Sequence, residues 1–168
     1  MFSGKVYLIQ DIKHLRLADD AVEQVIEAFK TYWVNGFHPD IGRDVITSRP
    51  NPPDGHRHAH VVPLVSDTSS RSSWKYWSSS KAKDEDFIAV DSNTNKIPTS
   101  DRLLFYFVDE SRNAYVFMYC PDDGHAYMNS REFTDLVEDV AAYLESEGVW
   151  LMNYTDQHRI WDDQWWSE

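Results

Sequence analysis

Two apolar runs separated by a short polar segment constrain the fold of this chain more than any other feature. Leu103–Val108 and Ala114–Cys120 are rich in aromatic and β-branched residues, and the polar residues 109–113 join them. Runs of this length and composition with a short polar connection are typical of a β-hairpin. The sequence therefore predicts a hairpin at the centre of a β-sheet.

Helical patterns flank this hairpin on both sides in the sequence. The first follows Asp20, a good capping residue, and ends at Gly36; the second follows Ser130 or Asn129 and ends at Gly148. The apolar stripe of the first comprises Val22, Val25, Ile26, Phe29 and Trp33. The stripe of the second comprises Phe133, Leu136, Val137, Val140, Tyr143 and Leu144. Each stripe has helical spacing, so both segments are predicted to be amphipathic helices.

Three further segments have strand patterns. Residues 5–10 alternate, with Val6 and Leu8 on one face. Residues 59–62 form a short run that Pro63 ends or confines to a sheet edge, and residues 149–154 could add a last strand. Helices that are separate from a run of antiparallel strands predict an α+β fold, with an antiparallel β-sheet and helices packed on one face.

The length of the chain predicts a single domain over residues 1–168. Within it, the Ser-rich residues 66–83 predict a long loop, and residues 149–168 form an acidic, Trp-rich C-terminal extension. Cys120 is the only cysteine, so no disulfide can form within the chain. The N-terminus lacks signal-peptide features and no apolar stretch is long enough to span a bilayer, so we expect a cytoplasmic protein without a membrane partner.

The net charge of −12 argues against a nucleic-acid binder if it is taken as an average. The acidity is uneven, however, because residues 109–168 contain half of the 28 acidic residues but only three of the 16 basic ones. This asymmetry suggests an acidic C-terminal face that could meet a basic partner or another part of the chain. A solvated surface that keeps the protein soluble is the alternative.

Four polar motifs follow one another along the chain. They are residues 36–44 (Gly-Phe-His-Pro-Asp-Ile-Gly-Arg-Asp), residues 57–60 (Arg-His-Ala-His), residues 99–101 (Thr-Ser-Asp) and His125. In this order they resemble the YafO-type toxins, RelE-like mRNA interferases of bacterial type II toxin-antitoxin modules. The resemblance extends over residues 5–47, 57–65 and 98–145. It departs from the family pattern at Pro98, where an Arg is expected.

This resemblance implies both a fold and an activity. The fold is RelE-like, a small antiparallel sheet flanked by helices. The activity is cleavage of messenger RNA on the ribosome, held in check by a cognate antitoxin. We therefore expect an endoribonuclease toxin that needs no metal or other cofactor.

Histidine and arginine residues in these motifs suit RNA cleavage. Without a metal, the reaction needs a base, an acid and a cation that stabilises charge on the phosphorus. His58 and His60 are two residues apart, so on an extended segment they point to the same face and could share acid and base work. Arg43, in a glycine-containing turn, could contact the scissile phosphate. The resemblance adds His125 and Asp101 to the expected catalytic set.

Five further residues are candidates for binding RNA. Arg57, Ser100 and Arg102 lie within or beside the motifs. Trp74 and Lys75 lie in the Ser-rich segment, where aromatic and basic residues could stack on bases and neutralise phosphates. The tryptophans of this segment could equally fill the core.

Other interpretations stay open for the same residues. His56, His58 and His60 could bind a metal, although no Cys and no close downstream acidic residue accompany them, or they could be polar residues on the outer face of an edge strand. Asp44 could cap a turn through its side chain. The whole chain could be a non-enzymatic acidic binding protein on the same fold, such as a nucleic-acid mimic or a mobile-element inhibitor.

The tail permits two hypotheses. Residues 156–168 combine three tryptophans with carboxylates, so the tail could cover the RNA-binding face. Alternatively, Trp161, Trp165 and Trp166 could pack against the sheet as an added structural layer.

Overall fold

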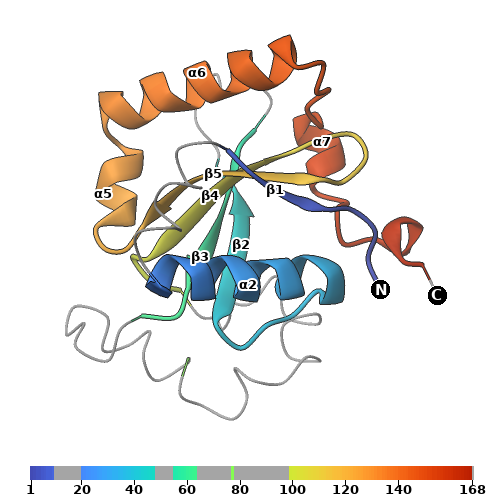
Figure 1. Cartoon of the computed structure of the whole chain (residues 1–168), viewed down its shortest axis with the longest axis horizontal. Helices are drawn as coiled ribbons and strands as arrows, with labels where there is room; N and C mark the ends of the chain where they lie inside the picture. Colours follow the sequence, from blue (N-terminus) through green and yellow to red (C-terminus); the bar gives the residue numbers. More distant parts are fainter. Residues whose placement is uncertain (10–19, 48–54, 64–76, 78–98, 168) are drawn as a thin grey trace.

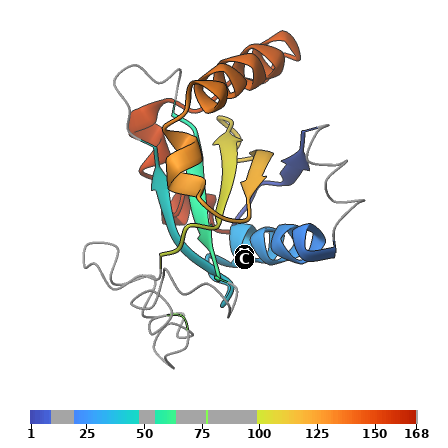
Figure 2. The same cartoon turned by 90° about the vertical axis from the view of Figure 1, so that its left-hand side faces the viewer.

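The computed structural model describes residues 1–9, 20–47, 55–63, 77 and 99–167. In this part of the chain, five strands form one sheet in the order β1-β5-β4-β3-β2. Helices α2 (Asp20–Asn35) and α6 (Arg131–Ser146) lie on opposite sides of the sheet (Figure 1, Figure 2). The fold is α+β, as predicted.

The hairpin at the centre of the sheet is confirmed. Strands β4 (Leu103–Val108) and β5 (Ala114–Cys120) pair in antiparallel fashion, and every residue of β4 is buried. Alternate residues of β4 face different helices: Leu104, Tyr106 and Val108 join the cluster under α2, and Leu103, Phe105 and Phe107 join the cluster under α6. Because both faces are covered, the strand is a continuous apolar run rather than an alternating one.

The two helices differ from the prediction in their placement. They were expected on one face of the sheet, but α2 and α6 cover different faces and build two separate apolar clusters. Their boundaries follow the capping residues, since the Ser130 hydroxyl accepts a hydrogen bond from the Phe133 amide at 3.1 Å and Gly36 and Gly148 have positive φ. Tyr143 is 51% exposed, so its predicted place in the buried stripe of α6 is wrong.

The outer strands make the sheet mixed rather than purely antiparallel. β1 (Val6–Leu8) pairs in parallel with β5, while the remaining pairs are antiparallel. β3 (Arg57–Val61) lies between β4 and β2 (Ile41–Ile46). Of the two alternatives for Pro63, an edge position for this strand is therefore wrong, because β2 forms that edge. The strand ends at Val61, just before Pro63, as the other alternative predicts.

The C-terminal segment packs under the sheet on the α2 side. The predicted strand over residues 149–154 is wrong: only a bridge between Asp109 and Leu151 forms, and α7 (Tyr154–Gln157) follows. Ile160 is fully buried, and the Trp161 ring lies 5.4 Å from that of Trp33. A 3-10 turn, η3 (Asp163–Trp165), then brings the end of the chain beside the N-terminus (Figure 1).

This packing distinguishes the two hypotheses for the tail. Trp161 and Trp165 pack against the apolar cluster that α2 covers, so these two tryptophans form a structural layer, whereas Trp166 is 51% exposed. No helix in the described ranges has both the length and the apolar character needed to cross a membrane.

Candidate active site

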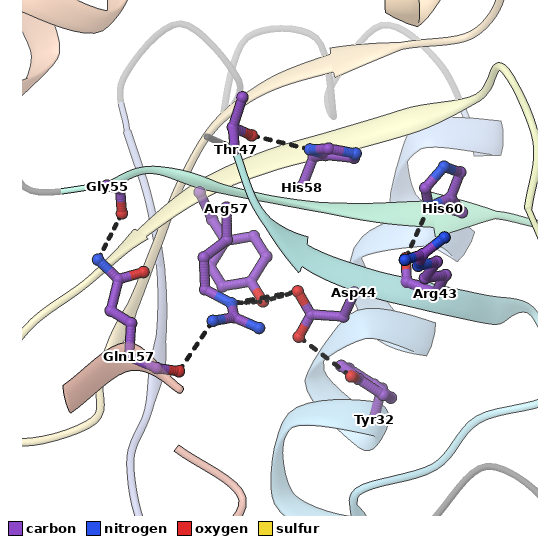
Figure 3. A network of polar contacts seen from close by, with 10 residues as sticks. Tyr32, Arg43, Asp44, Thr47, Gly55, Arg57, His58, His60 and Gln157 are labelled. Carbon is purple, nitrogen blue, oxygen red and sulfur yellow. Dashed lines mark hydrogen bonds and ion pairs between the residues drawn. The ribbon is translucent and has the colours of Figure 1, made fainter. Parts of the chain in front are cut away.

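Strand β3 sends its side chains alternately to the two faces of the sheet. Arg57, Ala59 and Val61 point toward α2, whereas His58 and His60 point to the opposite face (Figure 3). The ring centroids of His58 and His60 are 5.2 Å apart. The predicted shared face of this pair is confirmed.

A short helix brings a third histidine to the pair. α5 (Gly124–Met128) begins directly after β5, and its His125 ring lies 6.0 Å from His58 and 5.4 Å from His60. A Cβ at Gly124 would lie 2.7 Å from the Asp101 carbonyl oxygen, so glycine permits this close approach. The three histidines converge although 65 residues separate His60 from His125 in the sequence.

Each of the three imidazoles is oriented by a hydrogen bond at Nδ1. Thr47 Oγ1 lies 2.8 Å from His58 Nδ1, and the carbonyl oxygen of Arg43 lies 2.7 Å from His60 Nδ1 (Figure 3). Asp101 Oδ1 lies 2.5 Å from His125 Nδ1. A carbonyl or carboxylate oxygen can only accept, so His60 and His125 carry a proton on Nδ1. In a neutral His60, the Nε2 lone pair is then free.

The three rings line a pocket of about 480 Å³. Its other walls are Arg43, Val45, Ile46, Thr47, Thr99 and Met128. The exposed Arg43 side chain is part of the pocket wall and brings a positive charge to it. Trp77 is buried and donates from Nε1 to the Thr99 carbonyl at 3.1 Å, so this tryptophan of the Ser-rich segment packs inside the protein.

Burial controls the charge of the two strand histidines. It lowers the pKa of His58 to about 2, with further lowering by the nearby His60 and His125. Burial also lowers the pKa of His60 to about 4, although the hydrogen bond to the Arg43 carbonyl acts in the opposite direction. Both imidazoles are therefore neutral at pH 7 and present lone pairs rather than charge.

Arg57 does not contact this pocket, which corrects its predicted role in binding RNA. Its side chain is 5% exposed, lies on the α2 face and pairs with Asp44 at 3.2 Å. It also donates to the Tyr106 hydroxyl at 3.2 Å and to the Gln157 carbonyl at 3.0 Å (Figure 3). Asp44 is thus the partner of a buried cation and not a turn cap.

Ser100 and Arg102 are also structural rather than RNA-binding. The Ser100 hydroxyl donates to the Val61 carbonyl at 2.6 Å, which links the residues just before β4 to the end of β3. The buried Arg102 guanidinium donates to the Val62 carbonyl and to the Tyr119 hydroxyl. Both predictions fail because these polar groups are already satisfied inside the protein. Trp74 and Lys75 lie outside the described residues.

His56 is separate from the other histidines. Its ring is buried among aromatic side chains, 5.4 Å from Phe133 and 6.1 Å from Phe107. The alternative in which His56, His58 and His60 bind a metal is therefore wrong for His56. In the described part of the chain, the histidines whose ligand atoms converge are His58, His60 and His125.

The tail and the pocket lie on different faces of the sheet. Trp161 and Trp165 pack under α2, while His58 and His60 point to the other face. The hypothesis that the tail covers the RNA-binding face does not fit this arrangement. No protein-family model, curated protein or solved structure matches the chain.

Proposed function

We propose that this chain is a metal-independent endoribonuclease and that the histidine pocket is its active site. The observation that carries the proposal is the convergence of three imidazoles from β3 and α5 in one pocket, with the Arg43 guanidinium at its wall. These groups match the requirements of phosphodiester cleavage, which are a base, an acid and a cation.

The hydrogen bonds favour a different role in this proposal for each of the groups. His60 holds its Nδ1 proton against the Arg43 carbonyl, so its Nε2 can remove the proton from a ribose 2′-hydroxyl. The 2′-oxygen then bonds to phosphorus while the bond from phosphorus to the 5′-oxygen breaks. His125, whose Nδ1 lies 2.5 Å from Asp101 Oδ1, donates in its protonated form the Nε2 proton to that 5′-oxygen. The hydrogen bond with Thr47 orients the His58 ring within the pocket, and the Arg43 guanidinium stabilises the negative charge of the phosphate.

The wider biological role in this proposal comes from the motif resemblance. A YafO-type toxin would act on messenger RNA held in the ribosome and would be neutralised by a cognate antitoxin. The outer face of α6 offers a surface of suitable charge for a basic antitoxin segment. Its exposed acidic residues are Glu132, Asp135, Glu138, Asp139 and Glu145.

Cleavage by the purified chain tests the proposal. We expect the wild-type protein to cut RNA in EDTA, or ribosome-bound message once magnesium is restored to the ribosome, leaving a 2′,3′-cyclic phosphate. His125→Asn should reduce the rate by roughly 10²–10⁴-fold, since one proton-transfer group is lost. His158→Asn is the matched control, because His158 is exposed and meets Tyr154 of the tail edge to face. Equal rates for the two variants would contradict the proposal.

The acidic face of α6 also favours a second candidate function. A non-enzymatic binding protein would use these carboxylates to engage a basic partner and would need no pocket chemistry. In that case charge-reversal on α6 would abolish its biological effect, whereas His125→Asn would leave the effect unchanged. If the chain cleaves RNA as proposed, His125→Asn should instead reduce the biological effect.

A further inference from the structure

The three histidines of the pocket have the arrangement of a transition-metal site. One ligand atom from each of His58, His60 and His125 lies within 4.8 Å of the other two. Four-coordinate zinc with Zn–N bonds of about 2.0–2.1 Å holds its nitrogens about 3.3 Å apart. Binding of the ion would therefore draw the three nitrogens closer together. We infer that the pocket binds a Zn²⁺ ion through these three imidazoles and that the bound ion inhibits RNA cleavage.

The groups around the imidazoles support this inference independently of their spacing. Histidine ligands of metals use one ring nitrogen and donate the other N–H to a carboxylate, a carbonyl or another oxygen acceptor. Here the partners of the three Nδ1 atoms are Asp101, the Arg43 carbonyl and the Thr47 hydroxyl. In the described part of the chain, the Nδ1 atoms are thus engaged and the Nε2 atoms are left to bind the ion.

The pocket also leaves room for a fourth ligand. Zinc sites with three protein ligands keep one position for water or another small ligand. The space of about 480 Å³ beside the three rings accommodates such a ligand. All three donors are imidazole nitrogens, a donor type that suits zinc and copper better than magnesium or calcium. Magnesium from the ribosome would therefore not compete for the site.

Bound zinc would inhibit RNA cleavage because an Nε2 atom cannot bind the ion and transfer a proton at the same time. An Nε2 atom that binds zinc can neither accept the 2′-hydroxyl proton nor donate a proton to the leaving oxygen. This inhibitory part rests on the proposed function, whereas the binding part does not. Zinc would thus switch the same residues from acid–base chemistry to ligation.

Titration of the full-length protein with Zn²⁺ alone tests the binding part. After chelator treatment and desalting, the wild-type chain should bind one equivalent in a calorimetric titration, and Co²⁺ should give the visible spectrum of four-coordinate cobalt. Asp101→Asn should weaken zinc binding about 10–100-fold, because Asp101 orients a ligand without touching the ion. His125→Asn should weaken it further, and His158→Asn should bind like the wild type. Circular dichroism confirms that each variant is folded.

The outcomes separate the two proposals. Absence of zinc binding by the wild type, or equal binding by folded His125→Asn, overturns the site. If the zinc-free protein cuts RNA, one equivalent of zinc should reduce the rate at least about 10-fold and EDTA should restore it. An increase in rate on adding zinc overturns the inhibitory part. If zinc binds but the protein never cuts RNA, the site stands and the proposed function fails.

Discussion

Replacing Arg57 by Met tests whether this residue serves the fold rather than RNA. Arg57 and Asp44 are 5% and 3% exposed, so the substitution leaves a carboxylate buried without its ion-pair partner. Breaking a buried pair from one side costs about 3–5 kcal/mol of folding free energy. Asp44 still accepts hydrogen bonds from the hydroxyl groups of Tyr32 at 3.1 Å and Tyr106 at 2.7 Å. The cost of breaking the ion pair should therefore lie near the lower end of this range.

A second loss adds to this cost. The Gln157 carbonyl loses the hydrogen bond from Arg57 Nη1, and an unsatisfied buried acceptor costs about 1–3 kcal/mol. Together the two effects predict a loss of about 4–6 kcal/mol in the free energy of unfolding. For a domain of this size, that corresponds to a melting temperature lower by roughly 8–24 °C.

Urea denaturation followed by circular dichroism measures this loss, with Arg43→Met as the matched control. The Arg43 side chain is exposed, so the same substitution there should change stability by less than about 0.5 kcal/mol. The activities should show the reverse pattern: Arg57→Met should retain the cleavage rate per folded molecule, and Arg43→Met should lose most of it. A stability change below about 1 kcal/mol for Arg57→Met would refute the structural role.

Three further outcomes are expected. Arg43→Met should reduce the cleavage rate by about 10²–10³-fold in a single-turnover assay, because it removes charge stabilisation at the phosphate; an unchanged rate would remove Arg43 from the mechanism. Deleting residues 157–168 should destabilise the protein by more than about 2–5 kcal/mol, the cost of truncating the fully buried Ile160 alone, and thermal melting would show it; a stable product would contradict the structural-layer assignment. Burial and the nearby Asp122 raise the pKa of the Cys120 thiol to about 11, so its reaction with a disulfide reagent at pH 8 should be about 100-fold slower in the folded protein than in urea; similar rates would show that the thiol is accessible.

The hairpin and the two long helices could be predicted because their patterns are local. The apolar runs of β4 and β5 and the stripes of α2 and α6 are each contained in one segment, and capping residues mark where the helices begin and end. Which face of the sheet each helix covers is not local. It depends on the topology of the connections, and that is where the one-face prediction failed.

Strand β2 was not predicted because it is an edge strand with a polar sequence. It contains Gly42, Arg43 and Asp44, and its pairing with β3 is irregular between Ile41 and Asp44. Such a strand has no apolar alternation from which to predict it. Helix α5 is only five residues long and carries no apolar stripe, so the sequence pattern did not predict a helix at His125.

The site was predicted in part for the same reason. The His58 and His60 pair follows from strand alternation alone, whereas Thr47 could not be linked to His58 without knowing the β2–β3 register. Arg57 and Arg102 were assigned to RNA because a sequence shows a cation but not its partners. The carbonyl that accepts from Arg57 belongs to Gln157, 100 residues away.

The buried network of Arg57 and the histidine pocket are coupled through the register of two strands. In the β2–β3 pair, Asp44 is opposite Ala59 and Val45 is opposite His58. This register places the Arg43 carbonyl against His60 and Thr47 against His58 on one face, and Asp44 against Arg57 on the other. A slip by one residue would move every side chain of β2 to the wrong face. A slipped register would also break the buried Arg57–Asp44 pair, so this pair favours the native register. Once that register has formed, the contacts that orient the imidazoles do not involve Arg57.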